Sequence, residues 1–310
     1  MTIKYAIFSL VLCLGISPQG QADDAVSISV KEEGFTGTFY SGDGTTDRVG
    51  VMVLGGSEGG TPKRDAKRFA DAGYPALAVG YFKTEGTPSN LDQIPLEYFE
   101  KPLTWFGARF EMANRRIVVV GGSKGGELAL LIASRHREIA GVIAIAPSHV
   151  VFQGMPEEFW PPRSNWTMGG KDVPFVPYDI SAGIDLQNLR PMYEQSFAHK
   201  DLVENARIPI EKINGPILIL SGELDSMWPS STMGNKIVAT LKSKNFPHSF
   251  HHESYADAGH TLNEYFMIGG TKEGNKIARV DSWKRQVIFL KNLQERANKD
   301  DSPESTSRNP

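Results

Sequence analysis

The sequence predicts an α/β protein whose sheet is mainly parallel, and three observations lead to this class. Short apolar runs alternate with helix-forming stretches along most of the chain. Turns rich in Gly and Pro separate the two kinds of segment. Some of the runs, such as Val49 to Leu54, carry no polar side chain, as strands do when helices cover both faces of their sheet.

The elements follow one another in a regular order. Val26 to Val30 and Thr36 to Tyr40 alternate as strands around a turn at Gly34, and we expect them to form an antiparallel edge. The first helix starts at Thr61-Pro62, because Thr is a good N-cap and Pro suits the first helical position, and it ends at about Ala72. The chain then continues with expected strands at 74–79, 116–120, 141–146, 217–220 and 249–255, and with expected helices at 95–112 (kinked at Pro102), 127–136, 230–241 and 281–295.

The composition fits one large globular core and excludes some classes of function. The chain has 310 residues, a net charge of −3 and no dense stripe of Lys and Arg. We therefore expect no nucleic-acid partner. One domain, at 23–297, accounts for the alternation, and the polar tail at 298–310 is expected to be disordered.

The segment 1–22 has the layout of a secretory signal peptide. Lys4 supplies a basic start, Tyr5 to Ile16 an apolar stretch, and Gly20 and Ala22 the small residues that a signal peptidase reads. The apolar stretch is shorter than the roughly 20 residues of a membrane-spanning helix. We therefore expect cleavage after Ala22, no stable membrane span, and a secreted or periplasmic protein. Cys13, the single cysteine, would leave with the signal, so the mature chain would have no disulfide and no thiol nucleophile.

Two loops of the sequence read almost alike, and each contains Gly-x-Ser-x-Gly after a strand. They are VMVLGGSEGG, which contains Ser57, and VVVGGSKGGE, which contains Ser123. After Ser123 the chain passes directly into a helix-forming stretch without Pro, so this serine stands at a sharp strand-to-helix turn. Such a turn exposes a nucleophilic hydroxyl, and the helix N-terminus favours negative charge there. The pattern predicts Ser123 as a nucleophile, although the motif alone also arises by chance in Gly-rich turns.

The first loop leads less directly into its helix. That helix starts only at Thr61, so the loop around Ser57 is wider and its amide hydrogens are free to point inward. In the α/β-hydrolase plan the loop after the first parallel strand supplies an oxyanion donor, and the nucleophile comes two strands later. We therefore expect the backbone N–H groups of Ser57 and Lys124 to bind an oxyanion.

A phosphate-binding role for these loops fails on the residues present. A P-loop carries Lys where this chain has Glu127. A dinucleotide fingerprint needs Gly-x-Gly-x-x-Gly, which neither loop contains. We expect no cofactor.

The same plan places an acid and then a histidine downstream of the nucleophile. Asp225 follows the apolar stretch PILILSG and is the expected acid, with Glu223 as the second choice; Asp225 could alternatively be a turn former or part of a helix cap. His260 lies in a Gly-containing loop after the strand at 249–255 and is the expected base. Three further histidines lie within 248–252, but no cluster of acids or cysteines accompanies them, so we expect no metal site. In this arrangement His260 removes the Ser123 proton, Asp225 fixes the imidazole tautomer, and Ser123 attacks an acyl carbonyl.

One long segment, at about 148–208, interrupts the alternation of strands and helices. It is rich in Pro, Gly and aromatic residues, and a structureless loop of this length is uncommon inside a compact domain. We therefore expect an inserted cap segment that covers the site. Its aromatic side chains would bind the acyl group, or they would simply pack the excursion together. The residues expected to bind substrate are Phe152, Trp160, Trp166 and, further downstream, Trp228.

Several of these motifs together resemble one family. The resemblance rests on GGSEGG, GGSKGGELAL, FQG, IPIEKINGPILILSGELDSMWPS, AGH and GGTKEGN…DSWKRQVIFL, which occur in this order between about 49 and 290. They resemble the catalytic domain of the acyl-CoA thioesterase and bile-acid-CoA:amino-acid N-acyltransferase family, which is related to the dienelactone hydrolases. The resemblance implies an α/β-hydrolase fold, with Ser123 as nucleophile, Asp225 as acid and His260 as base.

The resemblance also implies a reaction. Members with Ser hydrolyse their substrates and the amino-acid transferases carry Cys, so Ser123 favours a serine hydrolase that cleaves acyl thioesters or carboxylic esters through an acyl-enzyme. With the signal peptide expected at 1–22, this hydrolase would be exported. The partner would be a small-molecule acyl ester or thioester. Export would take the protein away from cytoplasmic acyl-CoA, which leaves the natural substrate open. An acyltransferase, a peptidase with the same triad and a non-catalytic binding module on this fold remain alternatives.

Overall fold

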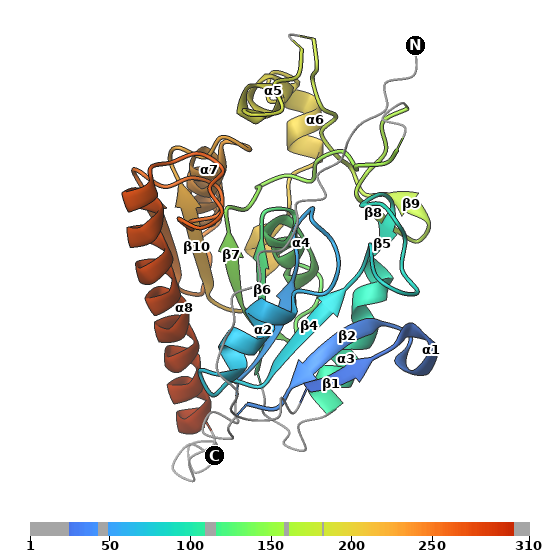
Figure 1. Ribbon diagram of the computed structural model, residues 1–310, viewed down its shortest axis with the longest axis vertical. Helices are drawn as coiled ribbons and strands as arrows, with labels where there is room; N and C mark the ends of the chain where they lie inside the picture. Colours follow the sequence, from blue (N-terminus) through green and yellow to red (C-terminus); the bar gives the residue numbers. More distant parts are fainter. Residues whose placement is uncertain (1–24, 43–48, 109–115, 158–160, 182, 301–310) are drawn as a thin grey trace.

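The computed structural model describes residues 25–42, 49–108, 116–157, 161–181 and 183–300 (Figure 1). The expected signal peptide, with Cys13, lies outside the described residues, and so does Trp160. The tail expected at 298–310 lies outside them from residue 301 onward, whereas residues 298–300 belong to a helix.

An eight-stranded sheet in the order β1-β2-β4-β3-β6-β7-β10-β11 forms the centre of the molecule. All neighbours from β4 to β11 are parallel, and β1 and β2 form an antiparallel edge. The prediction of a mainly parallel sheet with an antiparallel opening pair is confirmed. The strands are β1 (Ala25–Ile28), β2 (Thr36–Tyr40), β3 (Val49–Leu54), β4 (Ala76–Gly80), β6 (Arg116–Gly122), β7 (Ile139–Ile145), β10 (Ile217–Gly222) and β11 (Phe250–Tyr255).

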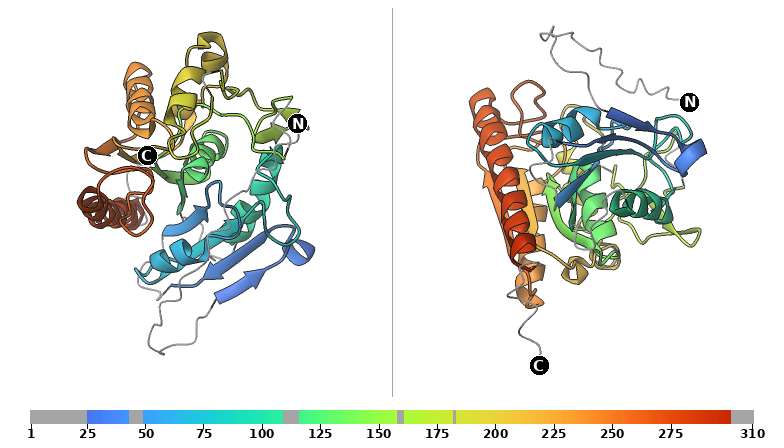
Figure 2. Two further views of the ribbon diagram at one scale, coloured as in Figure 1. Left: turned by 45° about the horizontal axis from the view of Figure 1, so that its top comes forward. Right: turned by 90° about the horizontal axis from the view of Figure 1, so that it is seen from below.

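Helices cover both faces of this sheet, which is why its central strands carry apolar side chains at successive positions. On one face, alternate strand residues such as Met52 and Val119 pack against α3, α4 and α7. On the other face, the intervening residues such as Val51 and Val118 pack against α2 and α8. Figure 2 shows these two layers. The helices are α2 (Lys63–Ala70), α3 (Glu100–Ala108), α4 (Lys124–Ala133), α7 (Ser230–Ser243) and α8 (Lys272–Asp300), besides the short α1 (Val30–Glu33) at the edge of the sheet.

The helices differ from their predicted bounds by two or more residues, and three of the differences have a clear structural reason. α4 begins at Lys124 instead of residue 127, directly after Ser123. The expected kink at Pro102 is absent, because Pro102 lies in the first turn of α3, where a missing N–H interrupts no helical bond, and a 3₁₀ turn, η1 (Leu96–Phe99), precedes it. α8 begins nine residues early, since Asn275 accepts from the Gly259 amide and donates to the Gly269 carbonyl and thereby stabilises a first turn that reads as a loop in sequence.

The segment at 148–208 folds as a cap with a core of its own. It contains β8 (Trp166–Met168), β9 (Lys171–Asp172), α5 (Arg190–Ser196) and α6 (Lys200–Asn205), and β8 pairs with β5 (Ile94–Pro95) in a separate three-stranded sheet; a 3₁₀ turn, η2 (Ile210–Lys212), comes next. Phe152, Tyr193 and Trp228 belong to its apolar cluster. In Figure 1 the cap lies at one end of the sheet, and Arg190 ties it to the loop after β10 by donating to the Glu223 and Asp225 carbonyls.

Candidate active site

Ser123 occupies a strained turn between β6 and α4. Its backbone has φ 55° and ψ −123°, which is unusual for a residue with a side chain. The Ser123 amide donates to the Ile145 carbonyl at the end of β7 at 2.8 Å, and its carbonyl accepts from Gly126 and Glu127 in the first turn of α4. These bonds hold the turn in place at the carboxyl end of the sheet. The side chain remains partly exposed.

The two glycine-rich loops lie against each other, backbone to backbone. A Cβ atom built on Gly56 would lie 3.3 Å from the Ser123 Cβ atom and 3.1 Å from the Gly122 carbonyl oxygen. A Cβ atom on Gly125 would lie only 2.5 Å from the Gly55 carbonyl oxygen, which is closer than real contacts allow. A side chain at Gly125 would therefore push the loops apart. The two similar Gly-Gly-Ser-x-Gly-Gly sequences thus form two loops that contact each other beside Ser123.

The amides expected to bind an oxyanion are both available. In the parts of the chain that the structure describes, neither the Ser57 N–H nor the Lys124 N–H donates to a protein acceptor. The neighbouring Gly56 amide is occupied, since it donates to the Glu58 carboxylate at 2.8 Å. Backbone N–H groups without partners can bind developing negative charge, and the Lys124 N–H also lies at the N-terminus of α4.

Tyr81, a residue that sequence reasoning did not select, stabilises the loop that contains Ser57 through a hydrogen bond to its backbone. Its hydroxyl donates to the Gly55 carbonyl at 2.6 Å, and its side chain is almost completely buried. Burial raises the pKa of Tyr81 well above its usual value, so the hydroxyl stays protonated and donates throughout the neutral range.

We expect Tyr81→Phe to lower the free energy of unfolding by about 1–3 kcal/mol, because the buried Gly55 carbonyl would lose its donor. Urea unfolding followed by tryptophan fluorescence measures this change. Tyr74→Phe is the matched control: Tyr74 is also buried, its hydroxyl has no described hydrogen-bond partner, and its loss should cost no more than about 0.5 kcal/mol. Equal effects of both substitutions would contradict a specific role for the Tyr81 hydroxyl.

Asp225 and His260 form a buried, hydrogen-bonded pair. His260 Nδ1 and Asp225 Oδ2 are 2.8 Å apart, and the two residues are 6% and 1% exposed. The Asp225 carboxylate also accepts from the amides of Met227 and Trp228 at 2.8 and 3.1 Å, and from the Ser230 hydroxyl at 2.6 Å. These donors fix the position and orientation of the carboxylate. Because His260 uses Nδ1 for its bond to Asp225, its other ring nitrogen, Nε2, is left for other partners.

The two loops that carry this pair are joined by a third segment. The His260 amide donates to the Ile268 carbonyl at 2.8 Å, and Asp225 and Gly269 form an antiparallel bridge. Glu223, the second choice for the acid, is exposed and accepts from the Ser254 hydroxyl instead. Of the two acids that follow β10, Asp225 is therefore the one that contacts His260.

The Ser123 turn and the Asp225–His260 pair are connected through the side chain of the residue after Ser123. Within the described residues the Ser123 hydroxyl makes no hydrogen bond with His260. The side chain of the next residue, Lys124, has its Nζ 5.5 Å from the centre of the Trp228 ring, and this ring packs edge-on against the His260 ring with 5.8 Å between centres. The Trp228 indole N–H donates to the carbonyl of Ala146, one residue after β7, at 3.0 Å.

The aromatic residues expected to bind substrate are packed inside the protein. Phe152, Trp166 and Trp228 are each at most 1% exposed, so they offer no free surface to a ligand in this structure. Phe152 and Trp228 lie in the cap cluster, and Trp166 packs on Tyr81 and on the main core. Phe152 and Trp228 lie beside Lys124, Trp228 also packs on His260, and Trp166 donates to Glu127.

A buried ion pair beside Ser123 was missed from the sequence. Lys124 Nζ lies 3.2 Å from Glu127 Oε2, and neither side chain is more than 2% exposed. Burial lowers the pKa of Lys124, and the adjacent Glu127 carboxylate opposes this shift. The available signal was a Lys and a Glu three positions apart, on one face of a helix that is otherwise apolar.

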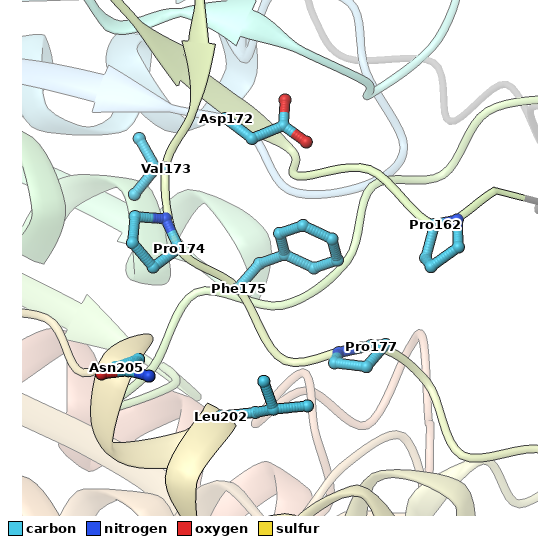
Figure 3. Close-up of a pocket in the computed structure, with 8 residues that line it drawn as sticks. All are labelled: Pro162, Asp172, Val173, Pro174, Phe175, Pro177, Leu202 and Asn205. Atoms are coloured by element: carbon cyan, nitrogen blue, oxygen red, sulfur yellow. The ribbon is translucent and has the colours of Figure 1, made fainter.

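Other kinds of site are sparse in the described part of the chain. No three His, Cys, Asp or Glu residues there are grouped so as to hold a metal ion. No helix among the described residues is long and apolar enough to cross a bilayer. A shallow pocket of about 430 Å³ lies in the cap and contains none of the predicted site residues (Figure 3); its lining is Pro162, Asp172, Val173, Pro174, Phe175, Pro177, Leu202 and Asn205.

Comparison with protein families places the chain in a known family. The family model described as BAAT / acyl-CoA thioester hydrolase C terminal matches residues 94–267. Acyl-coenzyme A thioesterase 6 of Mus musculus is 27% identical over 292 residues, which cover 86% of this chain and 65% of the relative. Bile acid-CoA:amino acid N-acyltransferase of Mus musculus is 26% identical over 284 residues, which cover 85% and 64%. The chain thus spans slightly less than two thirds of these relatives.

Solved structures agree on the fold. A sugar hydrolase from Lactococcus lactis superposes with a TM-score of 0.56 at 17% identity, covering 88% of this chain and all of the other. A protein assigned to the dienelactone hydrolases, from Klebsiella pneumoniae, gives a TM-score of 0.53 at 17% identity, covering 87% and 99%. These likenesses establish the α/β-hydrolase fold predicted from the sequence.

Proposed function

The chain belongs to the BAAT / acyl-CoA thioester hydrolase C-terminal family, and on this basis we propose that it is a serine hydrolase that cleaves acyl thioesters or carboxylic esters. In this proposal Ser123 is the nucleophile, His260 the base and Asp225 the acid. The observation that carries it is the buried Asp225–His260 hydrogen bond at the end of the sheet where the strained Ser123 turn begins α4.

The proposed reaction proceeds in two halves. His260 Nε2 accepts the Ser123 proton while Ser123 Oγ attacks the acyl carbonyl, and the amides of Ser57 and Lys124 donate to the resulting oxyanion. The imidazolium returns its proton to the leaving thiol or alcohol, and an acyl-enzyme remains. His260 then removes a proton from water, the hydroxide attacks the acyl-enzyme, and Ser123 Oγ leaves with the proton.

Hydrolysis is preferred over transfer because of the nucleophile. One similar protein is described as an N-acyltransferase and several as thioesterases. This chain has Ser at position 123 and no cysteine after residue 13, so we assign water as the acceptor. Transfer to an amine and peptide cleavage by the same residues are the alternatives.

The class of substrate depends on the proposed location. The layout of residues 1–22 supports export, so we propose a secreted or periplasmic enzyme. Acyl-CoA is a cytoplasmic thioester, whereas esters and other thioesters occur outside the cell as well. We therefore propose that the substrate carries an acyl group, and we do not assign the thiol or alcohol to which this group is joined.

A substrate panel tests the proposal. We expect the purified full chain to hydrolyse short p-nitrophenyl esters and acyl-CoA thioesters, with the free acid as the product even when glycine or taurine is present. Spectrophotometric rates and mass spectrometry of the products measure both points. An N-acyl amino acid as the main product would make the protein a transferase, and no turnover of either substrate class would favour a binding module.

A further inference from the structure

The ion pair between Lys124 and Glu127 lies in an unusual place. Both side chains are buried in the first turn of α4, and the rest of that helix is apolar or Gly. Burying two charges costs desolvation free energy that their attraction seldom recovers in full, so apolar residues of similar size would often serve stability as well. We therefore looked for a role of the pair other than stability, and the contacts of Glu127 and of Lys124 indicate such a role.

On the carboxylate side, Glu127 binds the cap. Its Oε1 accepts from the Trp166 indole N–H at 2.9 Å and from the Asn165 side-chain amide at 3.3 Å, and both donors are in or next to β8. The Trp166 ring lies 5.8 Å from the ring of Tyr81, whose hydroxyl holds the Gly55 carbonyl. The contacts of Glu127 thus extend to the loop that carries the Ser57 amide.

On the ammonium side, Lys124 contacts the residues around the histidine. Its Nζ lies 5.3 Å from the Phe152 ring centre and 5.5 Å from the Trp228 ring centre, within the range of a cation–π contact. Trp228 packs edge-on against His260 and donates its backbone N–H to Asp225 Oδ1 at 3.1 Å. Lys124 therefore fixes one side of the indole whose edge-on contact orients the imidazole, while the backbone N–H of the same residue, Trp228, binds the Asp225 carboxylate.

We propose that Lys124 and Glu127 are positioning residues: Lys124 holds Trp228 against His260, and Glu127 holds Lys124 and the cap in register with the two glycine-rich loops. The inference rests on the proposed function, because it assumes that His260, Asp225 and the loop amides act on an acyl substrate. Neither side chain has surface with which to contact substrate. Their effect should thus appear in kcat and not in KM.

The test separates positioning from stability by removing both charges at once. Lys124→Met and Glu127→Gln each leave one buried charge unpaired, so each should lower Tm by about 10 °C. The double variant K124M/E127Q keeps the side-chain volumes and buries no charge, so its Tm should return to within a few degrees of the wild type. Its kcat for a short p-nitrophenyl ester should nevertheless stay about 10- to 100-fold low, with KM within about twofold of the wild type.

The exposed pair Glu273–Lys276 supplies the matched control. It has the same residue types and the same spacing of three, on the first turns of α8, and both side chains are more than half exposed. Lys276→Met/Glu273→Gln should therefore leave kcat and Tm unchanged. A K124M/E127Q enzyme that regains both wild-type Tm and wild-type kcat would overturn the inference, and so would a rise in KM at unchanged kcat.

A milder variant covers the case in which the double variant does not fold. Trp166→Phe keeps an aromatic ring, removes the N–H that Glu127 accepts and leaves a small void in the core, so we expect a modest fall in Tm and a several-fold loss of kcat at constant KM. Wild-type kcat in this variant would equally overturn the inference. If the wild-type protein neither hydrolyses the ester nor reacts with a fluorophosphonate, the proposed function fails and the inference falls with it; if the wild type is active, a negative result concerns the inference alone.

Discussion

Ser123→Ala is expected to lower kcat for acyl substrates by about 10⁴-fold or more, because no other group can form the acyl-enzyme. The residual rate would come from the Ser57 and Lys124 amides, which remain in place. The strained backbone at position 123 is retained with Ala, so far-UV circular dichroism and Tm should show a folded protein. Steady-state kinetics with a p-nitrophenyl ester, at enzyme concentrations high enough to detect slow turnover, measures the loss.

Ser57→Ala is the matched control for this prediction. Ser57 stands in the other Gly-Gly-Ser-x-Gly-Gly loop, and only its backbone N–H has a role in the proposed mechanism. The substitution keeps that N–H, so kcat should change little. If Ser57→Ala abolished activity and Ser123→Ala did not, the assignments of the two loops would have to be exchanged.

Asp225→Asn is expected to lower kcat by about 10⁴-fold, with little change in KM. Asn can still accept from the Met227 and Trp228 amides, but it would turn an N–H₂ donor toward His260 Nδ1. The imidazole would then carry its proton on Nε2, where it can no longer accept a proton from Ser123. Kinetics, together with a Tm measurement to verify folding, checks the prediction.

Glu223→Gln provides the comparison for the acid. Glu223 follows the same strand but is exposed and contacts Ser254. The change should leave kcat within about twofold of the wild type, because a surface substitution away from the site rarely matters. A larger loss for Glu223→Gln than for Asp225→Asn would contradict the choice of acid.

The sheet and the two glycine-rich loops could be predicted from the sequence because their signals are local. A run such as Val49 to Leu54 has no polar side chain and fits only a strand covered on both faces. The sharp turn at Ser123 is expected wherever a strand passes into a helix without a spacer. The expected order of acid and histidine then points to His260 and to Asp225, with Glu223 as second choice, and the structure places Asp225 Oδ2 2.8 Å from His260 Nδ1.

The parts that could not be predicted depend on contacts distant in sequence. The first turn of α8 is stabilised through Asn275, which bonds to Gly259 and Gly269, and nothing in the local sequence indicates this. The burial of Lys124 and Glu127 likewise depends on Trp166 and Trp228, which lie about 40 and 100 residues further on. Charged residues in a helix usually indicate a solvated face, so their spacing in an apolar helix is not enough to predict that this pair is buried.

The role of the aromatic residues illustrates the same limit. Composition shows that the segment at 148–208 is rich in rings, and the cap does pack over the carboxyl end of the sheet. Composition does not show which rings face a ligand and which face one another. Phe152, Trp166 and Trp228 contact other rings and the buried ion pair, so their contribution runs through packing around Lys124 and His260.

The most direct test of Ser123 as the nucleophile is covalent labelling of the full chain with a fluorophosphonate, followed by intact-mass measurement and peptide mapping. We expect a single adduct on the peptide that contains Ser123, absent in Ser123→Ala and retained in Ser57→Ala. An adduct on Ser57, or no adduct on an enzyme that still hydrolyses acyl substrates, would contradict this expectation.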